Sequence, residues 1–364
     1  MNKRFVLGCL CVAACLAPGG LRAADPPVVP ETETISSRVT AVSVNVVVLD
    51  KDGYPVTGLR EKDFRIFDNG REQKLTNFLE TNQPLTLLTV IDSSGSTWKK
   101  INLIKEGAAD FIQRAALSRP QDRLAVVNFN EDIEVLSPFE SSWREKRALV
   151  LDRVDAQGGT ALYDALWLTA REILQKAHGR KVVVLYTDGI DNKSLKTFGE
   201  ARREAVASDA TFHVLTVDNL QQALKEAERS CYALTRGQYY AFIRQDDPRS
   251  EAPATPTWTR NMRSDFDARK VLEFTYKRAY EEMKRLAADT GGTFHKVSTY
   301  EELPVIYRRI ASEMPFYYTL TFMPEAAGAE GEYHQLEVRL SDPSWEARYR
   351  RGYLVTDRAE TKKR

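Results

Sequence analysis

Three short segments of the sequence carry side chains whose oxygen atoms could bind a cation. Asp92-Ser93-Ser94-Gly95-Ser96 offers a carboxylate and two hydroxyls at alternate positions. Gly159-Thr160 offers a third hydroxyl, and Thr187-Asp188-Gly189 offers a second carboxylate. Such hard oxygen donors suit Mg²⁺ or Mn²⁺ and suit zinc or copper poorly. The oxygen donors in these segments are Asp92, Ser94, Ser96, Thr160 and Asp188, with Asp191 close to the last of them.

Each of these segments, taken alone, has a plainer structural interpretation. The Asp92 and Gly159-Thr160 segments could each cap the amino end of a helix, and Asp188-Gly189 could form a simple turn. A shared metal site requires that all three segments meet at one edge of a sheet.

The segments lie within an alternating pattern of strands and helices. Apolar runs that are typical of strands buried on both faces occur at 85–91, 124–127, 182–186 and 212–217. Apolar residues at helical spacing occur at 101–112, 161–177, 272–286 and 303–310. This alternation predicts an α/β domain with a doubly wound, mostly parallel sheet. Ligands of such sheets bind at the carboxyl ends of strands, where Asp92 and Asp188 are expected.

Period-2 alternation on both sides of this pattern predicts a β-rich domain. It occurs before the α/β pattern at 42–48 and 64–66, with an Asn69-Gly70 hairpin, and after it at 316–322, 335–340 and 347–353. Neither flank is large enough to bury a core alone. We therefore predict one β-rich domain from residues 38–83 and 313–355, with the α/β domain inserted at 84–312. A charged, proline-containing stretch predicts an insertion at about 219–268.

In this order, Asp92-x-Ser94-x-Ser96, Gly159-Thr160 and Thr187-Asp188-Gly189 resemble the complete metal-ion-dependent adhesion site of von Willebrand factor type A domains. The resemblance covers about residues 84–312, and the 219–268 insertion departs from the family. The flanking Val56-Thr57-Gly58-Leu59, Asp63-Phe64 and Arg351-Gly352-Tyr353 resemble exported bacterial proteins related to that family.

This resemblance implies a doubly wound, Rossmann-like fold and a site for Mg²⁺, or Mn²⁺ or Ca²⁺, with the five candidate ligands Asp92, Ser94, Ser96, Thr160 and Asp188. It also implies a protein partner that presents an acidic side chain to the ion. We expect a divalent-cation-dependent adhesion or assembly module that is not an enzyme. The alternatives are a metal-independent structural or assembly module of the cell envelope, with a vestigial site, and a hydrolase.

The residues around Ser94 argue against catalysis. Ser94 lacks the Gly-x-Ser-x-Gly surroundings of a nucleophilic serine, and it stands where a phosphoaspartyl mechanism at Asp92 would need a second carboxylate. The sequence also contains neither a phosphate-binding Gly-x-x-x-x-Gly-Lys loop nor a His-Glu-x-x-His zinc pair. We therefore expect no catalytic residue and no cofactor other than the metal.

Composition and the N-terminal residues predict an exported globular protein. The 364 residues are 43% hydrophobic and 28% charged with a net charge of +1, which favours neither nucleic acid nor an anionic membrane as partner. Residues 1–23 resemble a cleaved signal peptide, so we expect a periplasmic or extracellular protein without a transmembrane span. The alternative is a lipoprotein anchored at Cys15. Residues 24–37 are expected to be a linker and 356–364 a charged tail.

Overall fold

The computed structural model describes residues 41–80, 83–115, 119–140, 151–230, 268–325 and 328–355. The predicted signal peptide, linker and charged tail, and most of the predicted insertion, lie outside these residues. None of the helices in the described ranges is long and apolar enough to cross a membrane.

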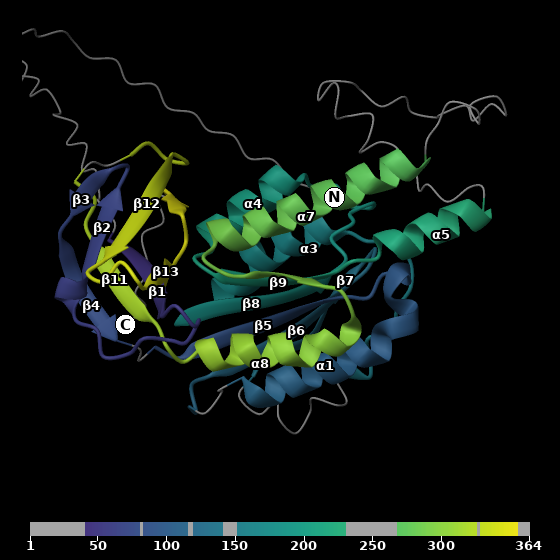
Figure 1. Cartoon of the computed structure of the whole chain (residues 1–364), viewed down its shortest axis with the longest axis horizontal. Coiled ribbons are helices and arrows are strands. Elements are labelled where there is room, and N and C mark those ends of the chain that lie inside the picture. Colours follow the sequence, from purple (N-terminus) through teal and green to yellow (C-terminus); the bar gives the residue numbers. More distant parts are fainter. Residues whose placement is uncertain are drawn as a thin grey trace, which may run out of the picture. The chain divides into compact units, whose positions relative to one another are not determined.

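A six-stranded sheet forms the centre of the α/β domain (Figure 1). In spatial order its strands are β10 (Phe294–Val297), β9 (Thr211–Val217), β8 (Arg180–Thr187), β5 (Leu85–Asp92), β6 (Arg123–Phe129) and β7 (Ile133–Glu140). All neighbours are parallel except β6 and β7, which pair antiparallel at the edge. The predicted mostly parallel sheet is therefore confirmed.

Helices cover both faces of this sheet, which explains its continuous apolar strands. Every residue of β5 is buried. One face packs against α1 (Ile101–Arg114) and α8 (Leu303–Glu313), where the Phe111 and Tyr307 rings lie 5.2 Å apart. The other face packs against α3 (Leu162–Leu168), α4 (Phe198–Ala207) and α7 (Ala268–Asp289), as Figure 1 shows.

Three helical segments differ from the sequence-based expectation. The helix predicted over 161–177 changes its winding after α3, with a π-helical segment at Thr169–Ile173 and a 3-10 turn at Leu174–Lys176. Helix α4 was not predicted, and neither was α5 (Leu220–Ser230), which occupies the start of the predicted insertion. Leu224 of α5 is buried against Leu272 and Tyr276 of α7.

Three further 3-10 turns are η1 (Glu61–Asp63), η2 (Gly95–Lys100) and η6 (Tyr300–Glu302).

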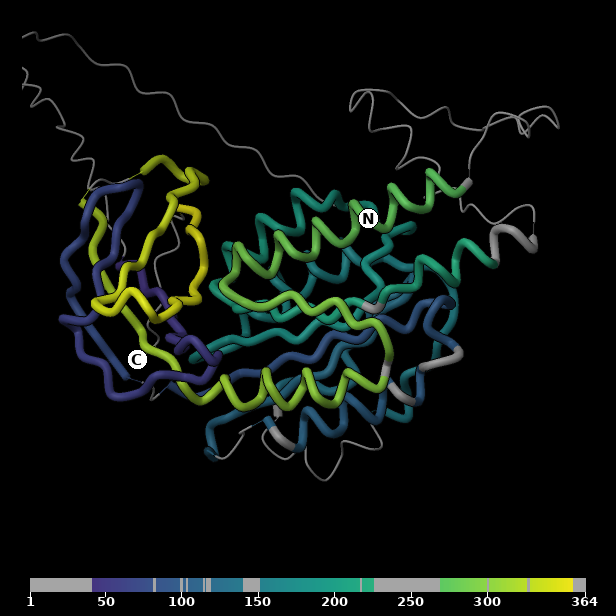
Figure 2. Tube along the Cα trace, in the orientation of Figure 1, coloured from purple at the N-terminus to yellow at the C-terminus, as the bar shows by residue number. Residues whose placement is uncertain are grey.

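The β-rich domain consists of two antiparallel four-stranded sheets, each built from both flanks of the chain (Figure 2). One sheet has the order β13 (Glu346–Arg348), β1 (Val42–Leu49), β11 (Tyr318–Phe322) and β4 (Leu75–Glu80). The other has the order β14 (Gly352–Leu354), β12 (Tyr333–Leu340), β2 (Phe64–Asp68) and β3 (Arg71–Gln73). Apolar residues from both sheets share one core, which contains Val44, Ile66 and Leu320. The predicted fold class, an α/β domain inserted in a β-rich domain, is confirmed.

Two details of this domain depend on local backbone geometry. Asn69 and Gly70 have φ angles of 47° and 80° and form the predicted hairpin turn. Its second arm is the short β3, and not the expected segment with Leu75 and Phe78, which pairs with β11 in the other sheet. The single strand predicted over 347–353 is instead two short strands, because the chain crosses from one sheet to the other. Val48 pairs with Ala347 in the first sheet, and His334 pairs with Tyr353 in the second.

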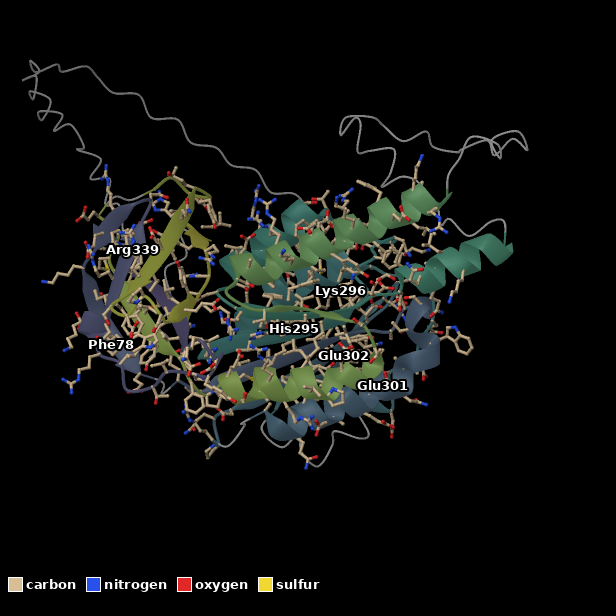
Figure 3. The ribbon with its side chains drawn as sticks, in the orientation of Figure 1. Phe78, His295, Lys296, Glu301, Glu302 and Arg339 are labelled. Atoms are coloured by element: carbon tan, nitrogen blue, oxygen red, sulfur yellow. The ribbon has the colours of Figure 1, made fainter. Side chains whose placement is uncertain are left out.

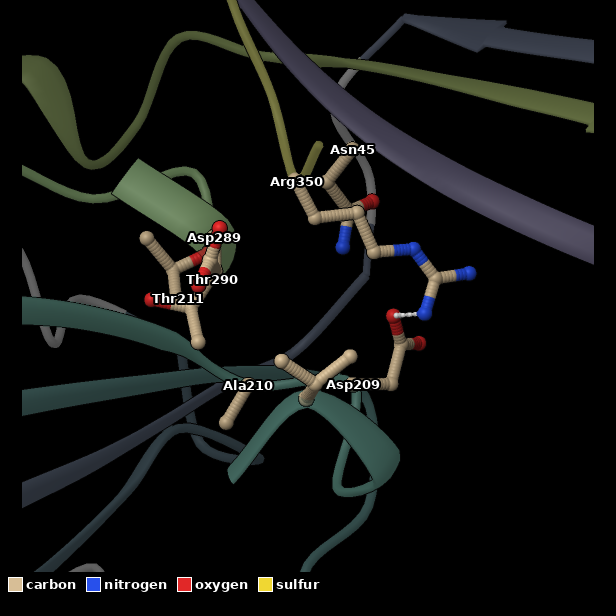
Figure 4. Close-up of a pocket in the computed structure, with 8 residues that line it drawn as sticks. Asn45, Asp209, Ala210, Thr211, Asp289, Thr290 and Arg350 are labelled. Carbon is tan, nitrogen blue, oxygen red and sulfur yellow. Dashed lines mark ion pairs between the residues drawn. The ribbon is translucent and has the colours of Figure 1, made fainter. Parts of the chain in front are cut away.

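Charged side chains connect the two domains near the amino end of β8. Buried Arg180 donates to the Met314 carbonyl oxygen and lies 4.0 Å from the Tyr317 ring centre. Arg348 of β13 forms a buried ion pair with Glu313 of α8. Nearby, Arg350 pairs with Asp209 at 2.8 Å in a small polar pocket (Figure 4). We call the contacts of these residues the domain seam.

Candidate metal centre

Asp92 is the last residue of β5 and is fully buried. Its Oδ1 accepts a hydrogen bond from the Ser94 main-chain N–H at 2.9 Å. Its Oδ2 accepts one from the Thr187 hydroxyl at 2.7 Å. The carboxylate therefore has a fixed orientation at the carboxyl end of the sheet, where the sequence placed it.

Ser94, Ser96 and Asp188 continue this arrangement. The Ser94 and Ser96 hydroxyl oxygens are 3.1 Å apart, and the Ser96 hydroxyl donates to Asp188 Oδ2 at 2.8 Å. Asp188 directly follows β8, the neighbour of β5, so two adjacent parallel strands bring both carboxylates to one edge. The structure thus brings together four of the five candidate ligands.

Thr160, the fifth candidate, is held beside them by its main chain. The preceding turn is joined to the Asp92 segment by two hydrogen bonds, from Gly95 N–H to the Gly158 oxygen at 3.0 Å and from Gln157 N–H to the Ser93 oxygen at 2.8 Å. The Thr160 N–H donates to Asn192 Oδ1 at 2.9 Å. The three loops therefore form one hydrogen-bonded cluster, in which Thr160 takes part through its main chain.

Glycine is required where the first two loops meet. A Cβ on Gly95 would lie 3.1 Å from the Gly158 oxygen, closer than most Cβ contacts. Gly158 has a φ of +69°, which side-chain-bearing residues rarely adopt. Small residues at both positions let the Thr160 loop approach the Asp92 loop.

Burial makes the two carboxylates difficult to ionise together. It raises the pKa of Asp92, and the nearby charge of Asp188 raises this pKa further. Burial likewise raises the pKa of Asp188, against hydrogen bonds that include one from the Asn219 side chain. Among the described side chains, no lysine or arginine forms an ion pair with either carboxylate. The nearby Lys296 (Figure 3) instead pairs with Asp218 at 2.8 Å.

The donor set at this edge fits a hard divalent cation. Two buried carboxylates without a side-chain cation need a proton or a metal ion to offset their charge. The cluster contains two carboxylates together with hydroxyls. A group of three or more His, Cys, Asp or Glu that could hold a metal does not occur among the described residues. Ser96 is exposed, which leaves this side of the cluster open to solvent. The ligand role of the five residues stays a prediction.

The sequence analysis missed three residues that support the cluster: Thr187, Asn192 and Asn219. The hydroxyl of Thr187 both donates to Asp92 and accepts from the Gly189 N–H at 3.0 Å. Thr187 could have been suspected, because it is the final residue of a buried strand beside Asp188. Asn192 and Asn219 act from loops whose paths the sequence does not predict.

Comparison with known proteins supports the fold of this region. Residues 87–247 match the family model of the von Willebrand factor type A domain. The α/β region is therefore similar in sequence to the von Willebrand factor type A domain family. No curated protein matches the sequence.

Solved structures similar to this chain share little sequence with it. The von Willebrand factor type A protein from Catenulispora acidiphila is 14% identical, with 80% of this chain and 72% of that chain covered and a TM-score of 0.42. BatB from Bacteroides thetaiotaomicron is 14% identical, with 63% and 98% covered and a TM-score of 0.40. Proximal thread matrix protein 1 from the mussel byssus, with a zinc-occupied metal-ion-dependent adhesion site motif, is 16% identical, with 65% and 46% covered and a TM-score of 0.42.

Proposed function

We propose that this protein is an exported, divalent-cation-dependent binding module for a protein partner that presents an acidic side chain. The observation that carries the proposal is the pair of buried carboxylates, Asp92 and Asp188, which adjoin hydroxyl donors and no described side-chain cation. Such a pair is stabilised by a divalent ion.

Asp92, Ser94, Ser96, Thr160 and Asp188 would hold Mg²⁺, Mn²⁺ or Ca²⁺ at the carboxyl edge of the sheet. Such ions take six or more oxygen ligands, so five side chains leave at least one coordination position that a partner's carboxylate would fill. Thr187 orients Asp92, and Asn219 orients Asp188. The exposed position of Ser96 favours contact with a partner on this side.

We propose that the module is not an enzyme. A serine nucleophile would need a histidine beside it. His178 precedes the amino end of β8, the end of that strand opposite Asp188, and the other three histidines contact side chains outside the cluster. His213 and His295 both contact the Thr293 hydroxyl, at 2.8 and 2.9 Å, and His334 contacts Asp68 in the β-rich domain. Ser94 instead lies beside Ser96 in the carboxylate cluster.

Thermal unfolding with a chelator, Mg²⁺, Mn²⁺ or Ca²⁺ tests the metal site directly. An ion at ~100 times its dissociation constant stabilises the folded state by about 2.7 kcal/mol. We expect the wild type to gain stability with an ion and Asp92→Asn, which keeps the side-chain shape, to gain none. Asp122→Asn is the matched control, because Asp122 is also a buried carboxylate that accepts main-chain hydrogen bonds, from Leu85 and Arg119.

The outcome separates the proposal from the metal-independent assembly module. A shift that disappears in Asp92→Asn and survives in Asp122→Asn supports the proposal. Equal melting temperatures in chelator and in all three ions would contradict it. Export is tested separately by fractionating cells and determining the mature N-terminus and its mass, which distinguish cleavage after Ala23 from lipid attachment at Cys15.

A further inference from the structure

Two exposed apolar side chains of the α/β domain lie close in sequence to the candidate ligands, at the carboxyl edge of the sheet, which we call the metal edge. Among the described residues of this domain, the two most exposed large apolar side chains are Leu195, at 93%, and Trp98, at 62%. Trp98 follows Ser96 by two residues, and Leu195 follows Asp188 by seven. Apolar side chains beside a binding site offer contact area that a partner can remove from water.

Leu195 is displayed on a main chain held in place by hydrogen bonds. Both carboxylate oxygens of Asp164 accept from this loop, Oδ2 from the Leu195 N–H at 2.9 Å and Oδ1 from the Lys196 N–H at 2.8 Å. The Asp164 N–H donates to the Ser194 hydroxyl at 3.0 Å, and that hydroxyl donates to Asp191. Because the loop is already ordered, a partner that packs on Leu195 avoids the entropy loss of ordering it.

The same loop is joined to the candidate metal ligands. The N–H groups of Asn192 and Lys193 both donate to the Thr160 carbonyl oxygen, at 3.0 and 3.1 Å. Leu195 is three residues beyond Asn192, so their Cα atoms are at most about 11 Å apart. In an extended segment, side chains two or three residues apart are separated by roughly 7–10 Å. These two lengths are similar, so one short segment of a partner can span from the loop that contacts Thr160 to Leu195.

The charged residues on either side of Leu195 are paired within the chain. Lys193 forms an ion pair with Glu131 at 3.2 Å, and Lys196 forms one with Glu200 at 3.6 Å. Lys196 also lies 5.0 Å from the Trp167 ring centre. The surface beside the metal edge thus offers an apolar contact flanked by neutralised charges, which favours an apolar side chain over a charged one.

We propose that Leu195 selects partners in which an apolar residue lies two or three positions from the metal-binding acidic residue, in one extended segment. This inference rests on the proposed function, because the acidic residue is placed by the ion. It adds that recognition requires a second, apolar contact with this chain. Leu195 acts here as a specificity-determining residue.

The probe is a library of random nine-residue peptides displayed on phage, captured on the full chain in Mn²⁺ and eluted with a chelator. For the wild type we expect Asp or Glu in the eluted peptides, with Leu, Ile, Val, Phe or Met enriched two or three positions away. Leu195→Ser should retain the acidic residue and lose the apolar enrichment. Tyr54→Ser is the matched control, because Tyr54 is 71% exposed in the β-rich domain, and it should retain both features.

Synthetic peptides from the selection make the test quantitative. Replacing the apolar residue by Ser should weaken binding about tenfold in the wild type and leave binding to Leu195→Ser unchanged. Acidic peptides without an apolar neighbour, or an apolar preference that survives Leu195→Ser, would overturn this inference and leave the proposed function intact. If chelator elution yields no acidic peptides, the proposed function fails, and this inference fails with it.

Discussion

Without a cation, ionising the carboxyl groups of Asp92 and Asp188 is energetically unfavourable, because both are buried and their negative charges repel each other. The folded chain keeps these groups protonated to a higher pH than the unfolded chain does, where aspartate titrates near pH ~4. Above that pH the folded state therefore binds more protons than the unfolded state. The free energy of unfolding should consequently fall as the pH rises.

This sign leads to the first prediction. In chelator, the wild type should lose more unfolding free energy between pH 5 and pH 8 than Asp92→Asn does, as measured by urea unfolding. The test compares the wild type with the variant because the lowered pKa values of His213 and His295 make the free energy of unfolding rise with pH in the acidic range. This contribution is common to both proteins and cancels in the comparison. Saturating Mg²⁺ should abolish the extra loss. Parallel pH profiles for the two proteins in chelator would contradict the assignment.

The hydroxyl of Thr187 should matter for metal affinity although we do not expect it to touch the ion. Thr187→Val removes the donor to Asp92 Oδ2 and leaves a buried carboxylate with one partner fewer. We expect metal affinity, measured by calorimetric titration, to fall about tenfold or more. Thr89→Val is the control on β5, because the buried Thr89 hydroxyl oxygen has no hydrogen-bond partner in the described structure, and this variant should bind metal normally. Equal affinity losses in both variants would mean that Thr187 has only a packing role.

Residue types predicted that oxygen donors after two buried strands converge at one sheet edge, and the motif resemblance selected the five candidate ligands. They did not predict the supporting amides. Asn192 reaches the Thr160 N–H across a gap of 32 residues, and the Asn219 side chain reaches Asp188 from the turn before α5. Those contacts depend on loop paths, which carry no periodic signal in the sequence.

At the scale of elements, the Gly158 turn holds the Thr160 loop against the Asp92 loop. Gly158→Ala must place a side chain at a φ of +69° and bring its Cβ to 3.1 Å from Glu131 Cγ. We expect it to destabilise the fold by about 1 kcal/mol and to weaken metal binding as the loop shifts. Thermal unfolding and metal titration measure the two effects.

Gly70→Ala is the matched control for this prediction. Gly70 has a φ of +80° in the β2–β3 turn, and nothing lies within 4 Å of a Cβ at that position. It should show a similar strain and unchanged metal affinity. If Gly158→Ala loses stability while its metal affinity stays at the wild-type level, the turn does not position the site.

Hydrophobic periodicity predicted most of the strands and helices. It failed where tertiary contacts determine whether a segment forms a helix or to which sheet a strand belongs. The apolar strands are buried on both faces, so their sequences identify them without ambiguity. Helix α5 was missed because its apolar residues, among them Leu220 and Leu224, are few and depend on α7 for burial. The split of 347–353 into β13 and β14 was missed because both halves alternate equally well, and only their partners in different sheets separate them.

At the scale of the whole molecule, the domain seam concentrates buried charge. Glu313 and Arg348 are 6% and 15% exposed, and buried Arg180 lies close enough to Glu313 for their charges to interact. Glu313→Gln would leave two buried guanidinium groups without that carboxylate. We expect a loss of about 3 kcal/mol in the free energy of unfolding, measured in urea.

The exposed Arg65–Glu72 pair of the β-rich domain provides the comparison. Its side chains are 58% and 47% exposed, so Glu72→Gln should change stability little. A loss in Glu313→Gln no larger than that in Glu72→Gln would show that the seam tolerates the unpaired arginines, for example through water.

The position of the domain seam also determines how a mechanical force applied at the metal edge would be transmitted to the β-rich domain. β5 enters the sheet at Leu85, which pairs with Arg180 of the seam, and ends at Asp92, roughly 23 Å away at about 3.3 Å per residue. The chain passes between the domains twice, after β4 and before β11, and Glu80 and Tyr318 at these passages are paired neighbours in one sheet. Tension applied by a partner at Asp92 would thus be shared by two covalent tethers that leave adjacent strands, and neither tether alone would bear the full load.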